Sequence, residues 1–390
     1  MERTVNVLDT SVKACLALFV VFSMFSISVT QISCALGGLA WLTKVHLTHS
    51  WNKVKLPLGL PILLFVLACI LAVITAVDPG NSYKSLKKLL QLLIFFWAVN
   101  NIKDDRQREF LVLLLIVAGC VAALNGIYQG WKDGVTVNTR VEGTMSMYMT
   151  FAGLLMLVGL LAIGRFLFNP ANEKWLIGAA ILLSICLLMT LTRQAWLGFF
   201  AGLAFLVYFW RREFLLSIPV FIFLILIFSP APVKDRIQSL IDMRDDSLDI
   251  RLSLWRGGLT IFKDHPLTGC GFKCVDIVHR QYPDPDGYLG RFKGMHNNFI
   301  QLLVDTGILG LGAWISIWVM YFYSLRRNFS PSNLDTRSRW TSITGGGGAV
   351  IGFHVGGLFE VNFYNSEVIM LLYFIMALPF TYPQPENPVK

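Results

Sequence analysis

Apolar runs of about 17 or more residues, each long enough to cross a hydrocarbon layer of roughly 30 Å as an α-helix, recur along the whole of this 390-residue chain. Charged residues make up 15% of the chain, whereas soluble domains contain about a quarter. Backbone polar groups inside a bilayer must be satisfied within the protein, which favours helices for such runs. The sequence therefore predicts an all-α polytopic membrane protein.

The apolar pattern predicts about 12 transmembrane helices, each near the usual length of roughly 20 residues. They are expected at residues 12–28, 31–46, 59–77, 86–101, 109–130, 148–168, 174–191, 195–210, 213–229, 298–325, 341–358 and 366–382. The second range is short enough to be a re-entrant segment.

Basic residues gather in alternate short loops, as they do in cytoplasmic loops of membrane proteins. With the N-terminus inside, the cytoplasmic set is Lys44, Lys53, Lys55, Lys103, Arg106, Arg108, Arg165, Lys174, Arg211, Arg212, Arg326, Arg327, Arg337 and Arg339. The opposite loops carry chiefly Lys84, Lys132, Arg140 and Arg193. The first apolar run lacks a small-residue cleavage site and is expected to be an uncleaved anchor. Both termini are thus predicted to be cytoplasmic.

The connection at residues 230–297 is far longer than the others and holds ten Lys/Arg and nine Asp. Long ordered loops are uncommon and usually functional. The sequence divides at this loop into residues 1–229 with nine membrane helices, the external loop 230–297, and residues 298–390 with three more. Within the loop, Leu252, Trp255, Leu259 and Phe262 recur at helical spacing, which predicts a short amphipathic helix at the membrane surface or over the bundle.

Three arginines on the external side are candidates for binding a phosphate. Arg193 lies between two spans, where its guanidinium could reach towards the headgroups or bind an oxyanion in a bidentate manner. Arg251 and Arg256 are five residues apart, so only one is expected to face a site, and Arg251 is favoured. Solvated ion pairs with the nearby Asp245, Asp246 and Asp249 are the alternative for both.

His296 stands immediately before a long apolar run and is followed by Asn297 and Asn298. The asparagines could simply cap the next helix, with the histidine as a polar interfacial residue. An imidazole, however, titrates near neutral pH and can take a proton from a hydroxyl group, which an arginine cannot do. His296 is therefore the candidate general base.

Two further patterns in the loop have competing explanations. His265, Cys270, Cys274 and His279 could form a zinc site, or the two cysteines could form a local disulfide in an oxidising compartment. The sequence "PDPDG" at 283–287 resembles an Asp-x-Asp metal motif, but its prolines are typical of a turn.

Three further features bear on helix packing, on ion transport and on nucleic-acid binding. The glycines of "TGGGGAV" at 344–350 predict close helix packing. An ion-coupled carrier needs charged groups inside its spans, and late in the chain only Glu360 and Glu367 are candidates. The net charge of +9 sits mainly in short loops, without the basic, aromatic-interleaved surface of a nucleic-acid-binding protein. No nucleic-acid partner is expected.

Four patterns in order resemble the O-antigen ligase/polymerase family of bacterial envelope proteins, and within it the O-antigen ligases of lipopolysaccharide assembly. They are "TLTRQAWLGF" at 190–199, "RLSLWRGGLTIFKDHPLTGCGF" at 251–272, "HNNFIQLLVDTGILGLG" at 296–312 and "GLFEVNFYNSEVIMLLYFIMAL" at 357–378. The resemblance implies a GT-C-like membrane glycosyltransferase in the bacterial inner membrane with its active site facing the periplasm. It implies transfer of a glycan from undecaprenyl diphosphate to a sugar hydroxyl of lipid A–core, with inversion and without a metal or other cofactor.

By the same resemblance, Arg193 and either Arg251 or Arg256 bind the donor diphosphate, and His296 activates the acceptor. Arg140 in "NTRVEGT" resembles a further family arginine. The remaining candidate substrate-binding residues are Asn297, Asn298 and Glu360.

Competing functions remain open on the sequence. A polysaccharide polymerase would use the same chemistry with two undecaprenyl-diphosphate glycans. A protein-glycosylating ligase is less favoured, because no large additional acceptor domain is evident. A flippase or solute carrier would need charged or broken spans through the midplane, and the polar residues gather instead at one face.

Overall fold

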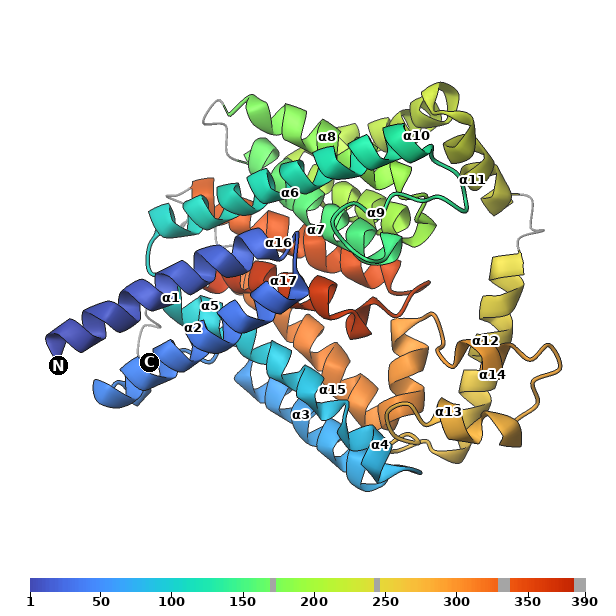
Figure 1. Cartoon of the computed structure of the whole chain (residues 1–390), viewed down its shortest axis with the longest axis horizontal. Helices are drawn as coiled ribbons and strands as arrows, with labels where there is room; N and C mark the ends of the chain where they lie inside the picture. Colours follow the sequence, from blue (N-terminus) through green and yellow to red (C-terminus); the bar gives the residue numbers. More distant parts are fainter. Residues whose placement is uncertain (169–172, 242–245, 329–336, 382–390) are drawn as a thin grey trace.

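A computed structural model of the chain describes residues 1–168, 173–241, 246–328 and 337–381. Asp245 and the last residue of the range 366–382 lie outside the described residues. Within the described part the fold is built of helices without strands (Figure 1). The α-helices are α1 (Glu2–Phe22), α2 (Ile27–Leu47), α3 (Gly59–Ile74), α4 (Pro79–Tyr83), α5 (Leu93–Asn101), α6 (Asp105–Asp133), α7 (Tyr148–Phe168), α8 (Trp175–Met189), α9 (Arg193–Arg211), α10 (Ser217–Phe228), α11 (Ala231–Ile241), α12 (Asp246–Asp264), α13 (Val275–Val278), α14 (Tyr288–Phe292), α15 (Asn298–Asn328), α16 (Arg337–Gly356) and α17 (Ser366–Ala377).

The apolar helices make this a multi-pass membrane protein. Among the described residues, α1, α6, α7 and most of α15 are long and apolar enough to cross a bilayer, and α3, α8 and the segment Ser366–Phe380 are shorter apolar helices. Helical structure occupies each of the twelve predicted ranges, although the number of membrane crossings stays a prediction. The range 31–46 is one continuous helix, whereas the range 86–101 begins with a 3-10 segment, Leu86–Leu92, before α5.

The centre of the bundle is the contact of α7, α9 and α16 (Figure 1). Glycines let these helices approach closely, as the 344–350 pattern predicted. A Cβ on Gly202 of α9 would lie 2.7 Å from the Gly348 carbonyl oxygen of α16, and one on Gly352 would lie 2.9 Å from that of Gly198. Side chains of any size are therefore excluded along this seam, which fixes the beginning of α9 relative to the end of α16.

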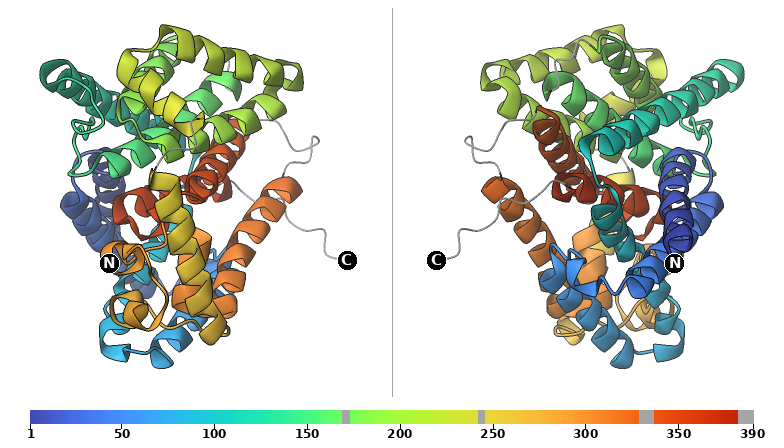
Figure 2. Two further views of the ribbon diagram at one scale, coloured as in Figure 1. Left: turned by 90° about the vertical axis from the view of Figure 1, so that its right-hand side faces the viewer. Right: turned by 90° about the vertical axis from the view of Figure 1, so that its left-hand side faces the viewer.

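The predicted amphipathic helix of the long loop is α12, and it packs against α14 and α15. The left view of Figure 2 shows it in the foreground of the molecule. Its apolar residues do not all pack on the protein. Leu254 and Ile261 are fully buried, whereas Leu252 and Leu259 are more than 40% exposed. The spacing alone did not distinguish the face packed on the protein from the face turned outwards.

The predicted span 298–325 is not one regular helix, because α15 is interrupted at Gly307 (φ 63°, ψ −165°). This backbone conformation is open essentially only to glycine. A Cβ here would lie 2.3 Å from the Leu267 carbonyl oxygen. The residues of 298–306 thus form a separate first segment of α15, in which the polar side chains lie.

The loop segment 266–271 runs beside this break and satisfies its backbone groups, as buried irregular backbone in a membrane protein requires. The amides of Cys270 and Gly271 donate to the carbonyls of Val304 and Asp305 at 2.9 and 3.2 Å. On the other side of the break, the amides of Ile308 and Leu309 donate to Pro266 and Leu267 at 2.9 and 3.2 Å. The break in α15 is therefore stabilised by backbone hydrogen bonds to the loop on both of its sides.

Two motifs of the long loop are settled by their geometry. Cys270 and Cys274 form a disulfide with their Cα atoms 5.7 Å apart, so their sulfurs are joined to each other rather than forming a zinc site with the neighbouring histidines. The "PDPDG" motif is a turn. Asp284 accepts a hydrogen bond from the Gly290 amide at 3.0 Å, and Gly287 has φ 68°.

Candidate active site

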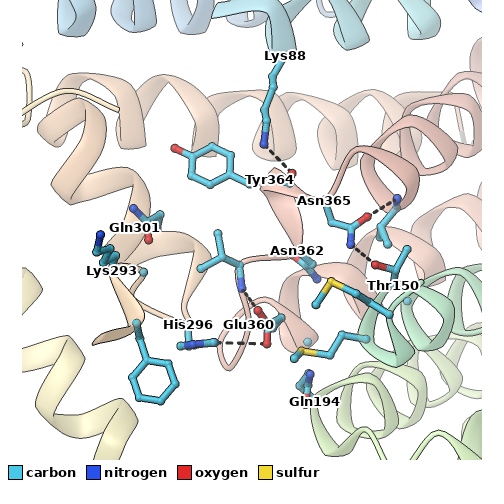
Figure 3. A pocket seen from close by; sticks show the side chains of 18 of the residues that line it. Lys88, Thr150, Gln194, Lys293, His296, Gln301, Glu360, Asn362, Tyr364 and Asn365 are labelled. Carbon is cyan, nitrogen blue, oxygen red and sulfur yellow. Dashed lines mark hydrogen bonds and ion pairs between the residues drawn. The ribbon is translucent and has the colours of Figure 1, made fainter. Parts of the chain in front are cut away.

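A cavity of about 520 Å³ opens where the first segment of α15, the start of α9, the start of α7 and the connection from α16 to α17 meet. Figure 3 shows the side chains around it. Its polar lining includes Lys88, Thr150, Gln194, Lys293, His296, Gln301, Asp305, Glu360, Asn362, Tyr364 and Asn365.

His296 lines this cavity and is paired with Glu360. The imidazole Nδ1 lies 3.4 Å from Glu360 Oε2, and the two side chains are 28% and 18% exposed (Figure 3). Glu360 Oε1 also accepts the Val361 amide at 3.1 Å. The ring of Phe292 stands edge-on to the imidazole, with centroids 5.9 Å apart. A carboxylate at Nδ1 favours the tautomer that carries its proton there and leaves Nε2 to accept a proton.

The backbone of His296 has a positive φ of 45°. Non-glycine residues with positive φ are uncommon, and local strain of this kind persists only where surrounding contacts hold it. Around His296 these contacts are the hydrogen bonds made by Asn297 and Asn298.

Asn297 and Asn298 provide those contacts, and they do not belong to the cavity lining. Asn297 Oδ1 accepts the amides of Phe299 and Ile300 at 2.8 and 3.1 Å, which is the capping role weighed from the sequence. Its Nδ2 donates to the Leu358 carbonyl at 3.0 Å.

Asn298 ties the same helix start to the segment that carries Glu360. Its amide donates to the Gly357 carbonyl at 2.7 Å, and its Oδ1 accepts the Phe363 amide at 3.1 Å. Its side chain is fully buried. The two asparagines hold His296 and Glu360 in position, and their part in substrate binding stays a prediction.

Arg193 and Arg251 converge on one hydroxyl group. Arg193 Nη2 donates to Ser247 Oγ at 2.6 Å, and Arg251 Nη1 donates to the same oxygen at 3.2 Å. Arg193 is 6% exposed, so it does not extend into the headgroups. Its neighbours Thr192 and Gln194 line the cavity, although neither arginine is itself part of the lining.

Arg251 also reaches the segment that holds Glu360. Its Nε donates to the Phe359 carbonyl at 3.2 Å, one residue before the carboxylate that pairs with His296. Arg256 lies five residues later on α12 and is exposed. Arg251 therefore contacts the segment of Glu360 and Arg256 does not, while the choice between them as diphosphate ligand stays a prediction.

Arg140 lies in the connection between α6 and α7, outside the cavity lining. Its Nε donates to the Val137 carbonyl at 2.9 Å, and its guanidinium stands 4.4 Å from the centroid of the Tyr148 ring. It is held beside the residues that begin α7, of which Met147 and Met149 reach the cavity.

Sequence reasoning missed a second group of polar residues in this cavity. Asp305 Oδ2 accepts Gln301 Nε2 at 3.0 Å and the Tyr364 hydroxyl. Burial raises the pKa of the Tyr364 phenol well above its usual value, and the nearby Asp305 carboxylate raises it further. The Tyr364 hydroxyl therefore keeps its proton and donates it in a hydrogen bond to Asp305. Lys88 donates to the Tyr364 carbonyl at 2.8 Å.

A signal for this group was present in the sequence. Gln301 and Asp305 follow Asn297 at intervals of four residues, so a polar stripe runs along one helical face of an otherwise apolar range. Lys88 gave no comparable signal, because it stands among leucines next to Lys87.

A comparison with protein-family models gives one match, to the family described as O-Antigen ligase, over residues 178–315. Residues 178–315 are thus similar to the O-antigen ligase family. The matched region is about a third of the chain and contains Arg193, Arg251, Arg256 and His296. No curated protein matches the chain. Members of this family are membrane glycosyltransferase-like ligases and polymerases, and the resemblance noted in the sequence is confirmed at this level.

Proposed function

We propose that the protein is an O-antigen ligase of the bacterial inner membrane. It transfers a glycan from undecaprenyl diphosphate to a sugar hydroxyl of lipid A–core on the periplasmic face. The observation that carries this proposal is the arrangement around one cavity. A His296–Glu360 pair lines it, and two arginines gather on Ser247 beside it.

The arginines suit the leaving group. When the bond between the anomeric carbon and the diphosphate oxygen breaks, the electron pair stays on that oxygen and negative charge grows on the diphosphate. Guanidinium groups of Arg193 and Arg251 bind phosphate oxygens in bidentate geometry. Fixed charges aimed at developing charge lower the barrier. A diphosphate held this way departs without a general acid.

His296 suits the acceptor. As the acceptor oxygen forms its bond to the anomeric carbon, its proton passes to His296 Nε2, while Glu360 holds Nδ1 and stabilises the imidazolium. A single displacement attacks the face opposite the leaving group and inverts the anomeric centre. The reaction as proposed uses no metal ion and no other cofactor, and EDTA is expected to leave purified activity unchanged.

The lipid part of the donor also has a place in this proposal. An apolar groove of about 420 Å³ lies between α7, α8 and α9 and is lined by Trp196, Phe199, Phe200 and Leu203 among others. Trp196 is one helical turn from Arg193, so a polyprenyl chain in this groove would reach the arginine with its diphosphate. The proposal further includes about 12 transmembrane helices, a GT-C-like architecture, and the division into residues 1–229, 230–297 and 298–390. Both termini are proposed to be cytoplasmic.

The decisive experiment is transfer in vitro with purified protein and an undecaprenyl-diphosphate-linked O-antigen as donor. Lipid A–core and a second undecaprenyl-diphosphate-linked repeat are offered as acceptors in parallel reactions. Transfer to lipid A–core supports the ligase. Transfer only to the second repeat makes the protein a polymerase, and movement of the lipid-linked glycan across vesicles without new glycosidic bonds would make it a flippase.

A further inference from the structure

Asp305 lies near the end of the first segment of α15, two residues before the break at Gly307, and contributes to the cavity wall. Its side chain is fully buried. One carboxylate oxygen, Oδ2, receives the side-chain amide of Gln301 and the hydroxyl of Tyr364. The other, Oδ1, has no hydrogen-bond partner among the described residues.

An open oxygen on a buried carboxylate is costly. Buried charged groups are normally paired and fully hydrogen-bonded, and an unsatisfied buried acceptor carries most of its desolvation cost. Such groups in native proteins call for an explanation, and a functional role is one of them. Asp305 is such a group, and the wall to which it belongs faces the same cavity as His296.

Lys88 adds a cation to this wall. Its Nζ donates to the Tyr364 carbonyl at 2.8 Å and stands 4.9 Å from the centroid of the Tyr364 ring. An ammonium group has three donors, so Lys88 has capacity beyond the carbonyl. A carboxylate, an ammonium and a carboxamide within one wall form a set that binds neighbouring hydroxyl groups, which act as both donors and acceptors.

The wall lies across the cavity from Gln194 at the start of α9. Figure 3 shows Gln194, the neighbour of Arg193, at one side of the cavity and Lys88 with Tyr364 at the opposite side, with His296 and Glu360 between these levels. In the proposed function the diphosphate is at the arginines. An in-line displacement brings the acceptor to the face of the anomeric carbon opposite the diphosphate. The acceptor sugar must then extend towards Lys88, Tyr364 and Asp305.

We propose that Asp305 is a positioning residue for the acceptor, with Oδ1 accepting a hydrogen bond from a sugar hydroxyl next to the one that reacts at His296. Lys88 donates to an oxygen of the same sugar. The inference rests on the proposed function and names the subsite that selects its second substrate. No bond in the acceptor is made or broken by Asp305.

The experiment measures steady-state transfer by purified Asp305→Asn, varying lipid A–core at saturating donor and then varying donor at saturating lipid A–core. The expected result is an acceptor KM raised about tenfold, as the loss of a hydrogen bond to a charged group predicts, with the donor KM within twofold of its original value. A purely structural role for Asp305 would lower the amount of active enzyme and leave both KM values unchanged. That result overturns the inference.

Asp264, the last residue of α12, provides a matched control. Asp264 Oδ2 accepts the Tyr282 hydroxyl at 2.9 Å, the same carboxylate–phenol pair outside the cavity lining. Asp264→Asn is expected to keep both KM values. A rise in acceptor KM in this variant equal to that of Asp305→Asn would overturn the inference.

If Asp305→Asn does not accumulate in membranes, Lys88→Gln decides the question, with a severalfold rise in acceptor KM expected and an unchanged value overturning the inference. The unsubstituted protein separates the two proposals. If it transfers no glycan to lipid A–core, the proposed function fails and this inference with it. If it does so and the variants retain its acceptor KM, only the inference fails.

Discussion

Glycines lie at two contrasting places in this fold, the seam between α9 and α16 and the break in α15. In the seam, Gly198 and Gly202 face Gly352 and Gly348 across a distance that admits no side chain, and both helices continue without interruption. In α15, Gly307 takes a backbone conformation outside the helical region and ends one segment so that another can begin. The first arrangement gives two helices a fixed separation. The second gives one helix two directions.

The contrast separates scaffold from site. The seam holds the start of α9, and thus Arg193, at a defined place beside the cavity. The break exposes polar residues of the first segment of α15 to the cavity and recruits the loop 266–271, which brings Phe272 and Lys273 to its wall. Changes at the seam should therefore affect how much folded protein exists, and changes at the break or the site should affect what the folded protein does.

The largest effect is expected at the site itself. His296→Ala should lower transfer by about 10²–10⁴-fold through loss of the general base, and Arg193→Ala by at least about 10²-fold through loss of charge stabilisation. Both should reach the membrane in normal amounts. The measurement is lipopolysaccharide banding in a ligase-null strain together with transfer in vitro. His46→Ala, which alters an exposed histidine of α2, is the control, and a full-length O-antigen ladder from either site variant would refute its role.

The next effect is expected at the break. Gly307→Ala puts a Cβ 2.3 Å from the Leu267 carbonyl oxygen in a conformation that costs about 1–3 kcal/mol for other residues. Specific activity should fall at least about tenfold, because a displaced first segment misplaces cavity residues by more than catalysis tolerates.

Gly312→Ala is the matched control for this variant, since a Cβ there meets nothing within 4 Å on the same helix. It should keep full activity and gain up to about 1 kcal/mol in stability. Equal specific activity in the two variants would mean that the break has no part in the site.

An effect of similar or greater size distinguishes the two arginines of α12. Arg251→Ala removes hydrogen bonds to Ser247 and Phe359 and should lower kcat/KM by about 10–100-fold. Arg256→Ala changes an exposed side chain and should stay within about twofold. The comparison is made on purified protein at fixed ionic strength. A greater loss for Arg256 would reverse the assignment of the diphosphate ligand.

The smallest effect on activity is expected in the seam. Gly202→Ala brings a Cβ to 2.5 Å from Leu160 Cδ1 and 2.7 Å from the Gly348 oxygen, so the helices must separate and stability falls by about 1–3 kcal/mol. Transfer per folded molecule should stay within about twofold. Thermal unfolding in detergent and active-site-normalised rates test this, with Gly178→Ala of α8, where a Cβ meets nothing, alongside. Lost transfer at unchanged stability would make the seam part of the site.

Much of the scaffold followed from sequence because its signals are local. Apolar runs located the helices, the glycine cluster at 344–350 indicated close packing, and the five-residue spacing of Arg251 and Arg256 separated their faces. Capping of the helix after His296 was one of the alternatives considered for the same reason, and Asn297 fills that role. These features depend on residues that are neighbours along the chain.

The missed features depend on contacts between distant segments. Gly307 stands within a range predicted as a single span, and the loop 266–271 is what makes a break there favourable. Lys88 reaches the cavity through Tyr364, which is 276 residues away. The buried face of α12 is set by its partners α14 and α15, so helical spacing alone did not show which of its apolar residues contact the protein.

The pairing of segment 266–271 with α15 has a consequence for biosynthesis. The ribosome completes Pro266 to Gly271 before it reaches Val304 to Leu309. The backbone groups of the loop that hydrogen-bond to both sides of the break therefore exist before α15 is made. Insertion of α15 into the bilayer can therefore be completed without an intermediate that leaves amides unpaired in lipid. In a permuted chain with the order of these two segments reversed, the backbone groups at the break in α15 would stay unpaired until the loop segment is synthesised.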